Sequence, residues 1–72
     1  MRTWLREFRT VKGFSQKELA VLLKISPQSM SFIESGERQK DMAFSLMKKL
    51  SETLEIPLNV IINRELDYKS NN

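Results

Sequence analysis

A chain of 72 residues has room for one compact domain and not for two. It contains no cysteine, no histidine and only two glycines, which excludes disulfides, Cys/His zinc sites, histidine-activated nucleophiles and glycine-rich phosphate loops, and leaves little support for an enzyme. The formal charge is +3, and the positive surplus lies in the first half: residues 1–40 carry eight basic and four acidic side chains, whereas residues 41–72 carry four and five.

The first predicted helix covers about residues 3–12. Thr3 is a possible N-cap, and Leu5 and Phe8 follow it at helical spacing. The segment stops at Gly13, a residue type that readily adopts the left-handed conformation at a helix end.

The second and third predicted helices are separated by only a short turn. Ser15-Gln16-Lys17-Glu18 has the form of a capping box, so we expect a helix over about residues 16–23. Ser26-Pro27 is an N-cap followed by proline at the first helical position, so a third helix starts there and ends at Gly36. A connection this short permits only a sharp corner between the two helices.

The fourth predicted helix is the clearest amphipathic segment. Asp41 is a plausible N-cap for it. Apolar residues then recur at helical spacing and form one stripe, which consists of Phe44, Met47, Leu50 and Leu54.

Pro57 opens a short fifth helix whose apolar residues include Leu58 and Ile61. The residues that follow are polar, so we expect a domain over residues 1–63 and a C-terminal tail over residues 64–72 that frays or contributes to dimerisation. Because no strand pattern occurs, the predicted fold class is all-α, with about five short helices.

The helix pair in residues 15–36 has the arrangement of a helix-turn-helix, in which the second helix enters the major groove of DNA. The sequence elements resemble the Cro and phage-repressor type of helix-turn-helix proteins, the XRE-like family. This resemblance covers about residues 5–61 and implies the compact five-helix bundle of phage-repressor DNA-binding domains. It rests on Arg9, Gly13, the segment from Ser15 to Ala20, Ile25-Ser26, the segment from Ile33 to Gly36, and Leu54-Glu55-Ile56.

The chain departs from the family pattern in the turn and after the third helix. Lys24 stands where the family usually has glycine, so a left-handed backbone there would cost about 1 kcal/mol or more. Ser35 stands where asparagine is common, and the segment after Gly36 looks about two residues longer than usual, with Lys40 in place of a frequent proline.

The outward face of the third helix is the predicted base-reading surface. A rotation of roughly 100° per residue places Gln28, Phe32 and Ser35 opposite the core side, with Ser29 on one flank. The amide of Gln28 can pair with adenine, and the ring of Phe32 can pack against a thymine methyl group. The resemblance implies base contacts for Gln28, Ser29 and Phe32; the alternative is an exposed ring and a solvated amide.

A second predicted layer of contacts goes to the phosphates and positions the protein without reading sequence. The resemblance implies that Gln16, at the amino end of the second helix, anchors the DNA backbone. For the charged candidates the alternative is a solvated surface charge. The further candidates are Lys17, Ser35, Arg38 and Lys40, with Lys24 of similar standing.

Glu34 lies near the core side of the third helix, where a carboxylate needs a partner to offset its desolvation. Arg9 is the candidate partner, and the family pairs residues at these two positions. We therefore expect a structural salt bridge between the first and third helices.

These features predict a sequence-specific regulator that binds double-stranded DNA: a repressor of bacterial or phage origin in the cytoplasm, associated with the nucleoid. We expect no catalytic activity, no cofactor, metal or small-molecule ligand, and no membrane partner. A symmetric homodimer on a palindrome would supply the specificity that one half-site lacks. Its predicted interface is Leu58, Ile61, Ile62, Leu66 and Tyr68.

The alternative is a helix-turn-helix fold used as a protein-interaction module, such as an antitoxin or anti-repressor subunit. Val21 and Leu22 stand where the family is usually polar, and with Phe32 they would form its contact patch. DNA affinity that falls steeply with salt favours the regulator, since binding through an apolar patch hardly responds to salt.

Overall fold

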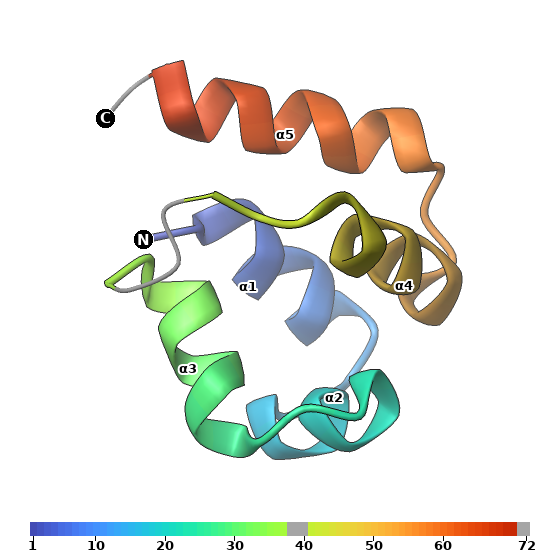
Figure 1. Ribbon diagram of the computed structural model, residues 1–72. Helices are drawn as coiled ribbons and strands as arrows, with labels where there is room; N and C mark the ends of the chain where they lie inside the picture. Colours follow the sequence, from blue (N-terminus) through green and yellow to red (C-terminus); the bar gives the residue numbers. More distant parts are fainter. Residues whose placement is uncertain (38–40, 71–72) are drawn as a thin grey trace.

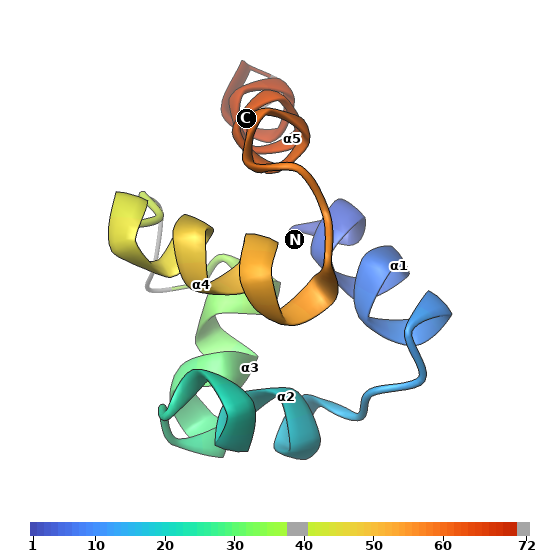
Figure 2. The same ribbon diagram turned by 90° about the vertical axis from the view of Figure 1, so that its right-hand side faces the viewer.

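The computed structural model describes residues 1–37 and 41–70 (Figure 1). These residues form α1 (Thr3–Val11), α2 (Gln16–Leu23), α3 (Pro27–Ser35), α4 (Phe44–Leu54) and α5 (Leu58–Ser70). No strand occurs in either range, and the predicted all-α fold class is confirmed. In both views α2 and α3 lie at one end of the molecule, whereas α5 crosses the opposite end above α1 and α4 (Figures 1 and 2).

The ends of the first three helices follow the sequence signals with one exception. The predicted bounds of α2 are confirmed, and α3 starts at Pro27 and is closed by Gly36 in the left-handed conformation, with φ 79°. The exception is Thr3, which is the first residue of α1 rather than its N-cap. Arg2 occupies the cap position, and no side chain caps this helix.

One apolar core holds the helices together. Each helix contributes at least one buried apolar side chain, and burying such a side chain stabilises a fold by about 1.5–3 kcal/mol. The core residues with almost no exposed surface are Leu5, Leu19, Ala20, Leu23, Met30, Leu50, Leu54 and Ile61.

The start of α4 differs from the sequence prediction. Ala43, not Asp41, is the N-cap, and the Asp41 carboxylate pairs instead with the Lys69 ammonium group. Phe44, the first residue of the predicted apolar stripe, is 58% exposed. Met42, which precedes the helix, fills the nearby core position instead and is buried.

The expected fraying from Arg64 onward is wrong through Ser70, because α5 continues to that residue. The polar segment is held by contacts with the rest of the molecule. Glu65 is buried and pairs with Arg2, and Tyr68 packs against the core. Partners outside the helix therefore stabilise residues whose own composition looks like a tail.

Candidate nucleic-acid interface

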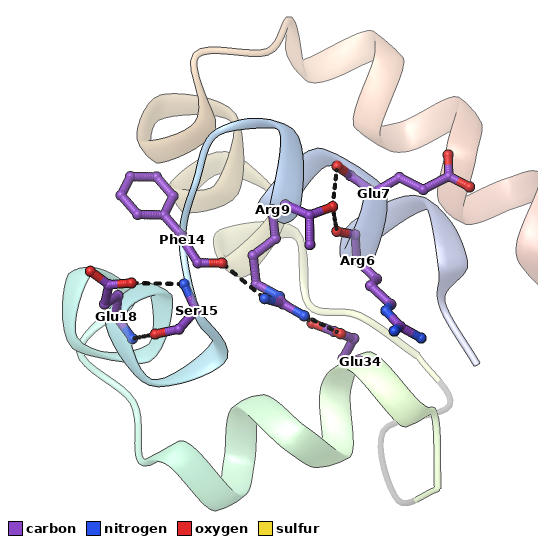
Figure 3. Close-up of polar contacts among 8 residues, drawn as sticks. Arg6, Glu7, Arg9, Phe14, Ser15, Glu18 and Glu34 are labelled. Atoms are coloured by element: carbon purple, nitrogen blue, oxygen red, sulfur yellow. Dashed lines mark hydrogen bonds and ion pairs between the residues drawn. The ribbon is translucent and has the colours of Figure 1, made fainter.

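The amino end of α2 is closed by a reciprocal capping box, as predicted (Figure 3). The Glu18 N–H donates to Ser15 Oγ at 3.0 Å, and the Ser15 N–H donates to Glu18 Oε1 at 2.9 Å. The hydrogen bond from the Ser15 backbone holds the pKa of the Glu18 carboxyl below its usual value. The start of α2 is thus defined by two local contacts.

The corner between α2 and α3 is made by Lys24, whose backbone is left-handed with φ 59° and ψ 42°. The left-handed backbone considered for this position, where the family usually has glycine, is therefore present at Lys24. The Ile25 N–H donates to the Ala20 carbonyl at 3.0 Å and closes the end of α2. Ser26 then starts α3 by accepting the Ser29 N–H at 3.0 Å. Both ends of the turn are fixed by hydrogen bonds within the chain.

The predicted recognition helix, α3, turns Met30 and Ile33 into the core. Gln28 is exposed, as expected for a side chain that faces a partner. Phe32 is half-buried rather than exposed. Its ring therefore points less toward solvent than the helical rotation predicts. The adjacent Ser31 is exposed. The outward face of α3 therefore offers an amide, a hydroxyl and part of one aromatic ring.

Two hydroxyl groups of α3 are already engaged within the chain. Ser29 Oγ accepts from Ser26 Oγ at 2.9 Å, which leaves its own proton available to an acceptor outside. Ser35 Oγ donates to the Phe32 carbonyl at 3.3 Å and accepts the Glu37 N–H at 3.2 Å. A phosphate contact from Ser35 would therefore require its hydroxyl group to rotate away from the Phe32 carbonyl.

The predicted ion pair between Arg9 and Glu34 is confirmed (Figure 3). Arg9 Nε and Nη2 each donate to one Glu34 carboxylate oxygen at 2.9 Å, and Nη1 donates to the Phe14 carbonyl at 2.8 Å. The hydrogen bonds to Glu34 raise the pKa of Arg9 above its usual value. This buried fork joins α1, the segment before α2, and α3.

Besides Ser35, three of the candidate phosphate contacts lie on α2 or directly after it. Gln16 is the first residue of that helix and is half-buried, and Lys17 beside it is exposed. Lys24, at the corner, is exposed as well. Arg38 and Lys40, the other two candidates, lie outside the described residues.

The predicted dimer residues do not form a single exposed set. Ile61 has no exposed surface and belongs to the core, so its predicted place in an interface is wrong for the folded chain. Tyr68 is half-buried, and the guanidinium carbon of Arg2 lies 4.8 Å from the centre of its ring. Leu66 is 57% exposed, and Leu58 and Ile62 are half-buried.

An ion pair between Arg2 and Glu65 was not predicted. Arg2 Nε and Nη2 donate to the two Glu65 carboxylate oxygens at 2.8 Å each. The available sequence signal was the position of Glu65, four residues after Ile61 on the same side of the helix. A carboxylate in line with a core residue needs a cation, but the spacing does not say which one.

An apolar hollow of about 360 Å³ lies on the outer side of α2. It is lined by Phe14, Glu18, Val21 and Leu22, and Val21 and Leu22 are 69% and 50% exposed. Residues 1–37 and 41–70 contain no cluster of acidic side chains able to hold a metal ion. None of the helices described is long and apolar enough to cross a membrane.

A family model described as a helix-turn-helix matches residues 5–61. Over 54 residues the chain is 39% identical to YqaF of Bacillus subtilis (strain 168), described as an uncharacterized HTH-type transcriptional regulator. The aligned segment is 75% of this chain and 68% of YqaF. No solved structure matches the chain significantly. The matched residues run from α1 into the first turn of α5 and include the whole capped α2–α3 pair.

Proposed function

We propose that this chain, which belongs to the XRE-like helix-turn-helix family and is a DNA-binding regulator of transcription, is a repressor that binds a palindromic operator as a symmetric dimer. In this proposal α3 enters the major groove and α2 lies across the DNA backbone. The observation that carries the proposal is the fixation of α3: it is capped at both ends, tied to α1 by Arg9 and Glu34, and presents Gln28 to solvent.

The base contacts in this proposal come from the first turns of α3. Gln28 offers both a donor and an acceptor to the N6 and N7 edge of adenine. Ser29 offers its remaining proton to an acceptor such as a purine N7. The outer part of the Phe32 ring packs against a thymine methyl group. Three adjacent side chains then read one half-site.

The phosphate contacts in this proposal come from the amino end of α2 and from the corner. Gln16 stands where the free N–H groups of α2 and the positive end of its dipole favour a phosphate. Lys17 and Lys24 add exposed positive charge nearby. Arg38 and Lys40 remain proposed contacts on the strength of their charge, and Ser35 remains one through rotation of its hydroxyl group.

The dimer in this proposal forms through the outer side of α5. Leu58, Ile62 and Leu66 repeat at intervals of four residues and therefore share one side of the helix. Their exposure, up to 57% at Leu66, leaves apolar surface uncovered in a single copy. The location proposed for such a dimer is the cytoplasm, associated with the nucleoid, and its role is binding without catalysis.

The test is a selection of bound duplexes from a randomised DNA library at low and at physiological salt. We expect a palindromic motif with half-sites about one helical turn, or ~10 base pairs, apart. Gln28→Ala should then weaken binding to the selected operator by about 1–3 kcal/mol, whereas Asn59→Ala, an exposed amide on α5, should not. The absence of an enriched motif at both salt concentrations would refute specific DNA binding by this chain.

A second candidate function, a protein-interaction module, is supported by the apolar hollow on α2. Val21 and Leu22 are large, exposed and adjacent to Phe14, which is unusual for a helix surface that meets only solvent or phosphate. The two candidates differ in their salt dependence. Phosphate neutralisation lowers the logarithm of the binding constant by about 0.9 per contact for each unit of log salt, whereas an apolar contact changes little.

A further inference from the structure

The guanidinium group of Arg2 connects the C-terminal helix to the end of the recognition helix. Arg2 has no exposed surface. Two of its nitrogens donate to Glu65 of α5, and the third, Nη1, donates to the Ile33 carbonyl of α3 at 2.6 Å. The backbone N–H of Arg2 also donates to the Glu34 carbonyl at 2.7 Å. Arg2 therefore donates two hydrogen bonds to α3 and two to α5.

These contacts supply what the end of α3 lacks. The last carbonyls of a helix have no partner within the helix, and a positive charge is favourable at that end of the dipole. Arg2 provides a donor to each of two such carbonyls, Ile33 and Glu34, together with the charge. The C-terminal end of α3 is therefore capped by a residue from the start of the chain.

The cap depends on α5 in turn. A buried guanidinium is stable only while its carboxylate partner is present, because an uncompensated buried charge is strongly unfavourable. Tyr68 adds a second contact: its ring lies beside the Arg2 guanidinium, and its hydroxyl group occupies the space that a Cβ on Gly36 would need. The left-handed end of α3 thus sits directly against α5.

We propose that Arg2 is a positioning residue that couples the docking of α5 to the order of the C-terminal end of α3. In free protein these two segments open as one cooperative unit, separately from α2. A ligand that binds one of these segments therefore also stabilises the other, and ligands of the two segments raise each other's affinity by the same factor. This consequence rests on the proposed function: a partner that binds α5 should raise the affinity of α3 for the operator.

Native-state hydrogen exchange tests the coupling without DNA. The reporters for α3 are the N–H groups of Arg2 and Gly36, which donate to the carbonyls of Glu34 and Phe32. In the wild-type protein at low denaturant, these amides and those of α5 should exchange with one denaturant dependence, distinct from that of the Ile25 N–H, which closes α2. Two separate dependences would overturn the proposal, and this measurement needs no variant that folds poorly.

Variants add a second test. Glu65→Gln keeps the side-chain shape and removes its charge, and should speed exchange at Gly36 and in α5 together by about tenfold or more. The matched control is Lys69→Met, which breaks the exposed pair between α5 and Asp41 and should leave Gly36 exchange within about twofold. Faster exchange in α5 with no change at Gly36 in Glu65→Gln would also overturn the coupling.

The DNA arm depends on the proposed function and fails separately from it. Because the proposed dimer also covers α5, this arm uses the Leu66→Lys variant, in which two copies should not pair through α5. Saturation of this variant with the selected operator should slow exchange in α5, which the proposed major-groove contacts do not touch. Operator binding by this variant that leaves α5 exchange unchanged contradicts the coupling and leaves the proposed DNA contacts of α3 intact. Failure to bind any operator contradicts the proposed function, and the exchange of the free protein still decides the coupling.

Discussion

Among single residues, we expect the ion pair between Arg9 and Glu34 to contribute most clearly to the stability of the fold. Glu34→Ala should lower the free energy of unfolding by about 3 kcal/mol, because it leaves the buried Arg9 guanidinium without its carboxylate. Urea unfolding followed by circular dichroism measures the change. Glu37→Ala is the matched control, since Glu37 is exposed just beyond α3. Equal effects of the two substitutions would show that the fork contributes no net stability.

The carboxylate of Glu18 in the capping box should make the stability of the fold depend on pH. Because its pKa is lowered in the folded state, its contribution to stability is present above the ordinary glutamate pKa of about 4.3 and is lost as pH falls through the lower folded value. The stability difference between wild type and Glu18→Gln should therefore shrink between about pH 6 and pH 3. Lys17→Gln, which keeps the carboxylate, should retain the wild-type pH dependence. A constant difference for Glu18→Gln across this range would contradict the shift.

At the scale of the helices, α2 and α4 both end in a left-handed residue that is not glycine: Lys24 at φ 59° and Glu55 at φ 55°. A side chain in this conformation destabilises the folded state by about 1–2 kcal/mol. Glycine avoids that strain, but it also raises the conformational entropy of the unfolded chain, which offsets part of the gain. Lys24→Gly should therefore raise the free energy of unfolding by about 0.5–1 kcal/mol. Lys24→Ala removes the same charge but keeps a Cβ, so it separates the two causes. A glycine variant no more stable than the alanine variant would exclude backbone strain.

The same helices show which features a sequence can and cannot predict. The bounds of α2 follow from the chain because its capping box joins residues only three apart. In α4 the predicted cap Asp41 pairs instead with Lys69, 28 residues away in the sequence, and Ala43 is the N-cap. In α5 the helix continues beyond the predicted end, where Glu65 pairs with Arg2 at a separation of 63 residues. Local signals therefore predicted helix ends wherever the partner was local.

The candidate site divides in the same way. The exposure of Gln28 and the pairing of Arg9 with Glu34 followed from helical rotation and the family resemblance. The engagement of Ser35 within its own chain did not, because hydroxyl partners depend on rotamers that a sequence pattern does not fix. The complete burial of Ile61 could not be predicted from periodicity either, because consecutive apolar residues in α5 do not show which of them faces the core.

At the scale of the whole molecule, size argues for two copies on DNA. The Cα atoms extend 29 × 25 × 21 Å, whereas successive major-groove segments on one side of DNA are about 34 Å apart. The start of the predicted reading helix lies at the end of the molecule away from α5, and only the last turn of that helix approaches α5 (Figures 1 and 2). A two-fold contact between α5 helices would leave both reading helices uncovered.

This arrangement predicts the effect of charge on the outer side of α5. Ile62→Lys should yield an 8.5 kDa monomer in sedimentation equilibrium, because a two-fold contact would place two ammonium groups in one apolar interface. Operator affinity should fall by about tenfold or more, since the second half-site no longer binds intramolecularly. Leu66→Lys repeats the test at a more exposed position where folding is less at risk, and Val11→Lys, on the exposed side of α1, is the control for added charge. If Ile62→Lys and Leu66→Lys both remain dimers of unchanged affinity, the contact lies elsewhere and α5 serves the single chain alone.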